Sequence, residues 1–61
     1  MTFSAFEKYK EAEREVALRR SVYKARIAVG KMKQAEADQR IACMEAIAAD
    51  YKAQVDGAEV G

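Results

Sequence analysis

The stretch Val29-Gly30-Lys31-Met32-Lys33-Gln34-Ala35-Glu36 decides the fold of this 61-residue chain. Gly30 is the only glycine before residue 57, and the chain contains no proline. Apolar residues recur at helical spacing on both sides of this glycine. A glycine between two helical patterns is typical of a helix end, because glycine adopts the left-handed conformation without a Cβ penalty. The stretch therefore predicts a turn over residues 30–33, with Gly30 and Met32 in it, that joins two antiparallel helices.

The first helix is expected at about residues 4–29. Ser4 is followed three residues later by Glu7, which is the Ser-x-x-Glu pattern of a helix N-terminus. Phe3, just before the cap, could pack against the first turn of the helix. A frayed start is the alternative, since chain termini are often poorly ordered.

The second helix is expected at about residues 34–55. Glu36 places a carboxylate in its first turn, where it is favourable to the helix dipole. Lys33 is a poor N-cap residue, because its side chain has no oxygen to accept a backbone N–H bond. Asp56-Gly57 predicts the end of this helix, followed by a loose tail over residues 56–61.

The first helix is apolar on two nearly opposite faces. The stripe expected to face the second helix has a 3-4 spacing and consists of Phe6, Tyr9, Glu13, Val16, Arg20, Tyr23 and Ile27. Glu13 and Arg20 interrupt its apolar character, and they are expected to be semi-buried with their charged heads paired or at the rim. The opposite stripe consists of Leu18, Val22, Ala25 and Val29. The two stripes lie roughly 200° apart, so one neighbouring helix cannot cover both. The second stripe predicts an oligomer interface, although single apolar residues on a surface are also common.

The second helix carries one heptad-like seam. Its residues are Ala37, Ile41, Met44, Ala48, Tyr51 and Val55, and small alanines beside larger side chains favour close packing. Alanines also repeat on the outer side of this helix. They could allow another helix to pack closely there, or they could be present only because alanine has a high helix propensity. We therefore predict an all-α fold: one helical-hairpin domain over residues 1–61, assembling as a dimeric four-helix bundle.

Composition indicates that the chain needs a partner for stability and has no pattern of catalytic or metal-binding residues. A chain of this size buries only about 60% of its unfolded surface, and its single cysteine, Cys43, cannot form an internal disulfide. With no histidine and one thiol, a zinc site is not expected, and Cys43 is expected to be a packing residue. No phosphate-binding loop or catalytic constellation is present. We expect no enzyme activity, no catalytic residue, no metal and no cofactor.

Charge is balanced overall, with 11 basic and 10 acidic residues, but it is unevenly distributed. A basic patch near the turn is the one candidate for binding an external partner; it consists of Arg19, Arg20, Lys24, Arg26, Lys31 and Lys33. Such a patch could follow the phosphates of a nucleic acid, but no stacking aromatics other than Tyr23 interleave with it. A solvated face, or pairing with acids in the same bundle, is the alternative.

The central residues resemble a group of small uncharacterised proteins of phages and prophages. The resemblance covers about residues 11 to 52 and is carried by Glu15-x-x-x-Arg19-x-x-Val22-Tyr23, by Gly30-Lys31-Met32, and by Ala37-Asp38-x-x-Ile41-x-x-Met44-x-x-Ile47-x-x-Asp50-Tyr51. Members often have Ser or Thr where this chain has Lys33. The resemblance implies an accessory protein made in the bacterial cytoplasm, and it names no target.

These observations lead to three functional hypotheses. The first is a non-enzymatic accessory protein that binds itself and a host or phage protein, for example as an inhibitor of a host defence complex of the anti-CRISPR type. The second is a small nucleic-acid-binding dimer that uses the basic patch. The third is a structural helical module whose only partner is itself. The chain has no run of apolar residues long enough for a membrane span, and no membrane partner is expected.

Overall fold

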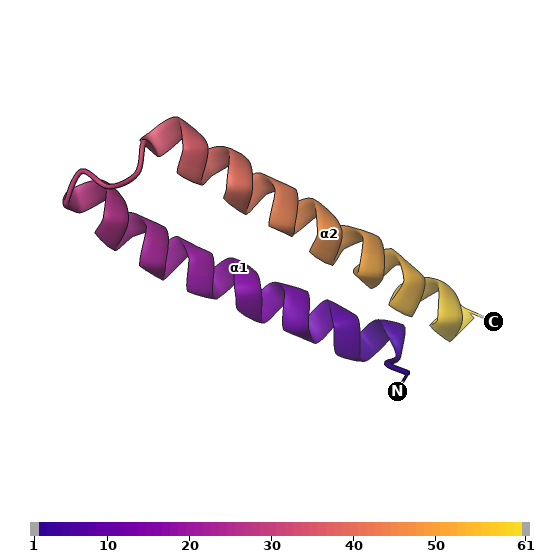
Figure 1. The fold of residues 1–61 in the computed structure, drawn as a ribbon. Helices are drawn as coiled ribbons and strands as arrows, with labels where there is room; N and C mark the ends of the chain where they lie inside the picture. Colours follow the sequence, from indigo (N-terminus) through magenta and orange to yellow (C-terminus); the bar gives the residue numbers. More distant parts are fainter. Residues whose placement is uncertain (1, 61) are drawn as a thin grey trace.

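Two antiparallel helices form a hairpin in the structure, a computed structural model that describes the backbone of residues 2–60 and the side chains of residues 2–57. Helix α1 spans Ala5–Ala28 and helix α2 spans Gln34–Val60 (Figure 1). The hairpin measures 48 × 22 × 15 Å. The described residues contain no strand. The predicted all-α hairpin is therefore confirmed.

Helix α1 begins with the side-chain cap that the Ser-x-x-Glu pattern predicts. Ser4 has an extended backbone, and its Oγ accepts a hydrogen bond of 3.1 Å from the backbone N–H of Glu7. The carbonyl of Ser4 also accepts the N–H of Lys8 at 3.1 Å. Ser4 thus satisfies one of the amide groups that a helix start leaves without an internal partner. Phe3, next to the cap, is exposed.

The turn has the hydrogen bonds of a Schellman motif. Gly30 adopts a φ of +75°, so the predicted left-handed glycine is confirmed. The N–H of Lys31 donates to the carbonyl of Arg26 at 2.9 Å, and the N–H of Gly30 donates to the carbonyl of Ile27 at 3.0 Å. These two bonds satisfy carbonyls at the end of α1 and turn the chain back on itself. Met32 is half-buried in the same turn.

Helix α2 begins at the predicted residue but ends later than predicted. It starts at Gln34 without a capping side chain from Lys33, although the carbonyl of Lys33 accepts the N–H of Ala37 at 3.1 Å. The prediction of a loose tail over residues 56–61 is wrong for residues 56–60, because α2 continues to Val60. Gly57 weakens a helix without ending it when its φ stays negative and no proline follows. An i,i+4 ion pair of 3.1 Å between Lys52 and Asp56 stabilises this last part. Gly61 lies outside the described residues.

The seam between the helices is narrow and is lined mainly by small or half-buried side chains. The nine residues predicted for it are all buried or half-buried; they are Tyr9, Val16, Tyr23, Ile27, Ala37, Ile41, Met44, Ala48 and Tyr51. Among the described side chains only Ala12, Ala37 and Ala48 are fully buried. The Nζ of Lys8 lies 5.6 Å from the centre of the Tyr51 ring, which adds a contact across the open end of the hairpin.

The predicted stripe on α1 is wrong at three positions. Phe6, Glu13 and Arg20 are exposed, whereas Ala12 is buried and Arg19 is half-buried. A 3-4 spacing fits either set, since Ala12 and Arg19 each lie one position before the residue predicted. The small side chain of Ala12 allows the second helix to approach closely, and this favours the observed choice.

Candidate interaction surface

The predicted oligomer stripe on α1 is exposed in the single chain. Leu18, Val22 and Val29 are 55%, 40% and 67% exposed, and Ala25 is exposed as well. These four apolar residues therefore have no cover within the hairpin. Ser21, Arg26 and Lys31 line the same shallow surface and form its polar border.

One broad side of the hairpin combines this stripe with residues of α2. A groove of about 350 Å³ between the helices contains Glu11 and Glu15 of α1 and Met44 and Ile47 of α2. Leu18 and Val22 continue the line of Glu11 and Glu15 along α1, because the four residues are spaced 4-3-4.

On α2 the same side carries Cys43, one helical turn before Ile47. Ile47 is 40% exposed and Cys43 is exposed. We call the set Leu18, Val22, Cys43 and Ile47 the apolar broad face. The expectation that Cys43 packs inside the fold is wrong, because the seam passes through Ile41 and Met44 on either side of it.

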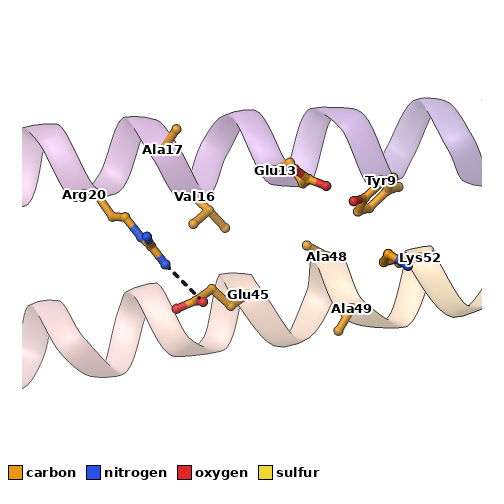
Figure 2. A pocket seen from close by; sticks show the side chains of 9 residues that line it. All are labelled: Tyr9, Glu13, Val16, Ala17, Arg20, Glu45, Ala48, Ala49 and Lys52. Atoms are coloured by element: carbon orange, nitrogen blue, oxygen red, sulfur yellow. Dashed lines mark ion pairs between the residues drawn. The ribbon is translucent and has the colours of Figure 1, made fainter.

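The opposite broad side carries an ion pair between the two helices. Figure 2 shows Arg20 and Glu45 pointing toward each other across the two helices, and their Nη2 and Oε2 atoms are 3.1 Å apart. Val16 and Ala48 point into the space between the helices, while Ala17 and Ala49 point away from it. The hollow on this side has a volume of about 420 Å³ and is open to solvent. Both members of the ion pair are largely exposed, so its contribution to stability is about 0–1 kcal/mol.

The basic patch is divided by the fold into two groups. Arg19 and Arg20 are held within the chain, since each forms an ion pair with a glutamate at 3.0 and 3.1 Å. Lys24, Arg26, Lys31 and Lys33 are exposed around the turn, and among the described side chains no carboxylate lies within 4.0 Å of them. The structure thus keeps four cations of the predicted patch free at one end of the hairpin.

Arg19 is the most strongly engaged of these cations. Its Nε donates to Oε1 of Glu15 at 3.0 Å, and its Nη1 donates to the backbone carbonyl of Arg40 at 3.0 Å. The hydrogen bond to Glu15 raises the pKa of Arg19, and partial removal from water opposes that rise. Arg19 therefore stays charged at every ordinary pH and links α1 to the backbone of α2.

A second exposed apolar patch lies at the start of α1. Phe3 and Phe6 are 53% and 56% exposed, and they line a hollow of about 580 Å³ together with Glu7, Lys8, Lys10 and Glu11. Sequence reasoning placed Phe6 in the seam and so missed this patch. The available signal was Ala5, which is half-buried beside Phe6 and belongs to the observed stripe.

Metal binding and membrane insertion each require a particular arrangement of residues. Within the part of the chain that the structure describes, no group of three or more His, Cys, Asp or Glu side chains is placed to hold a metal ion. Over the same residues, neither helix combines the length and the apolar character that a bilayer crossing requires.

Comparisons with protein-family models, with curated proteins and with solved structures find no significant match. The resemblance to phage and prophage proteins stays a prediction from the central residues.

Proposed function

We propose that this chain is a non-enzymatic interaction protein that works as a dimeric four-helix bundle. The observation that carries the proposal is surface area. The chain exposes 4853 Å², whereas a compact monomer of 6.8 kDa is expected to expose about 3,950 Å². The excess of about 900 Å² is close to the roughly 800 Å² that each partner contributes to a standard protein interface.

The thin core supports the same proposal. No large side chain among the described residues is fully buried, and the three buried residues are alanines. A domain this small is stabilised in nature by disulfides, by metals or by association with other chains. A single exposed cysteine and the absence of histidine leave association as the favoured route.

The biological setting of the proposal comes from the sequence pattern. The turn Gly30-Lys31-Met32 and the flanking residues resemble those of small phage and prophage proteins, and this resemblance implies an accessory protein that acts in the bacterial cytoplasm, on a host or phage protein. Inhibition of a host defence complex is one form of that activity. Protein binding is favoured over nucleic-acid binding because two of the six predicted cations are already paired within the chain.

Solution mass tests the dimer. Sedimentation equilibrium at micromolar concentration is expected to give twice 6.8 kDa for the wild-type chain. The double variant Leu18→Glu, Val22→Glu is expected to lower the mass to that of one chain, because it places two charges in the predicted interface.

A matched control is available on α2. Ala42→Glu, Ala46→Glu adds the same charge at the same i,i+4 spacing on exposed positions of the outer side of α2, and it is expected to leave the mass unchanged. A wild-type mass of 6.8 kDa, or dissociation by the control pair alone, contradicts the proposed interface.

Target binding is tested with the same variants. Tagged wild-type chain expressed in infected bacteria is expected to retain one bacterial or phage protein at stoichiometric amount in mass spectrometry. The control pair is expected to retain it as well. A chain that is dimeric and retains only itself supports the third hypothesis, a structural module, and refutes target binding.

A further inference from the structure

The hairpin has a strongly basic end and a strongly acidic end. Residues 19–41, at the turn end, contain seven basic and two acidic side chains. Residues 1–18 and 42–61, at the open end, contain four basic and eight acidic ones. The net charges of the two halves are thus +5 and −4.

Folding is what separates these charges in space. The two helices run antiparallel from the turn, so the end of α1 from residue 19 and the start of α2 up to residue 41 lie along the same half of the hairpin. In Figure 1 the start of α1 and the end of α2 lie at the same end, away from the turn. The two acidic segments, which are far apart in the sequence, therefore meet at the open end.

Resting on the proposed dimer, we propose that a second copy of this chain covers the apolar broad face with its turn end over the open end of the first. A two-fold symmetric pair can stack on this face in two ways. If the axis runs along the hairpin, the two turn ends coincide and the two +5 halves lie together. If the axis runs across the hairpin, each +5 half lies against a −4 half. Charge complementarity selects the second arrangement, since juxtaposed like charges disfavour an interface.

The apolar residues fit the same axis. Leu18 lies ten residues before the end of α1 and Cys43 lies nine residues after the start of α2, so both are about 14–15 Å from the turn at 1.5 Å per residue. An axis across the hairpin at this level lays each helix over the same helix of the second copy. Leu18 and Cys43 then each face the same residue of the second copy close to the axis.

The size of the face is sufficient for such a pair. A side of 48 by 22 Å has a projected area of about 1,000 Å². A standard interface needs about 800 Å² from each partner. The opposite broad side is a poorer surface, because the exposed ion pair of Arg20 and Glu45 bridges it.

The two arrangements are distinguished by one distance between spin labels. The variant Lys31→Cys, Cys43→Ser carries a single labelling site in the exposed turn. With the axis across the hairpin, the two labels lie about 40 Å apart, from 13 residues on each side of the axis at 1.5 Å rise. With the axis along the hairpin, they lie within about the 22 Å width of the molecule. Lys33→Cys in the same background repeats the measurement at a second exposed position.

Each outcome decides between the proposals when it is read with the mass of the labelled protein. A dimeric mass with labels about 40 Å apart at both positions supports the crossed arrangement. A dimeric mass with labels within 22 Å overturns it and leaves the proposed dimer standing. A monomeric mass overturns both.

Discussion

Two glycines in this chain have opposite roles, and exchanging each for alanine tests the fold at the turn. Gly30 has a φ of +75°, whereas Gly57 lies inside α2 without a positive φ. A Cβ added at either position meets no atom within 4 Å. An added Cβ is therefore not crowded at either site, and the two substitutions differ only in the backbone conformation that they must adopt.

The expected magnitudes follow from the two conformations. Gly30→Ala forces a side chain into the left-handed region at a cost of about 1–2 kcal/mol, offset by about 0.4–1 kcal/mol through the stiffer unfolded chain. The net loss is about 1 kcal/mol, or a fall in Tm of about 4–8 °C for a domain of this size. Gly57→Ala is expected to gain about 0.5 kcal/mol, because alanine is the better helix former and the site is near the end of α2.

The assay is urea unfolding followed by circular dichroism at 222 nm. All variants are compared at one total chain concentration, because the stability of an associating chain depends on it. Gly30→Asn serves as an intermediate control, since asparagine enters the left-handed region more readily than alanine. A Gly30→Ala variant as stable as the wild type, or a Gly57→Ala variant that loses as much as Gly30→Ala, refutes the assignment of the turn.

Two other substitutions test the cap and the seam by the same measurement. Ser4→Ala is expected to lower the free energy of unfolding by about 1 kcal/mol, because the Glu7 amide loses its acceptor. Ser21→Ala, in the exposed middle of α1, is expected to leave the free energy of unfolding unchanged. Ala37→Leu is expected to lower the free energy of unfolding by about 1–3 kcal/mol, because Ala37 is only 1% exposed and a larger side chain separates the helices. Ala35 is exposed, so Ala35→Leu is expected to stay within about 0.5 kcal/mol of the wild type. Equal losses at Ala37 and Ala35 contradict the close approach of the helices at the turn end.

The two ends of α2 differ in how well local sequence signals predict them. Sequence placed it at Gln34 although Lys33 is a poor cap, and the structure begins the helix there. The end of α2 was missed because Asp56-Gly57 resembles a stop signal. The pairing of Asp56 with Lys52 and the absence of proline let the helix continue.

The sequence by itself determined the turn at Gly30 and the two helices, because only glycine takes a positive φ without strain and because apolar residues recur at helical spacing. Tertiary structure alone decided which of two neighbouring stripes enters the seam, placing Ala12 and Arg19 there in place of Glu13 and Arg20. Spacing cannot distinguish these stripes, since the choice depends on how closely the second helix approaches.

Tertiary structure also decided which surface is left uncovered. Leu18 and Val22 share one side with Ile47 only because the chain folds back at the turn and α2 packs along α1. The same fold gathers the two acidic segments at one end and leaves the basic residues at the other. Such a separation depends on contacts between residues 21 positions apart, and no local pattern in the sequence contains it.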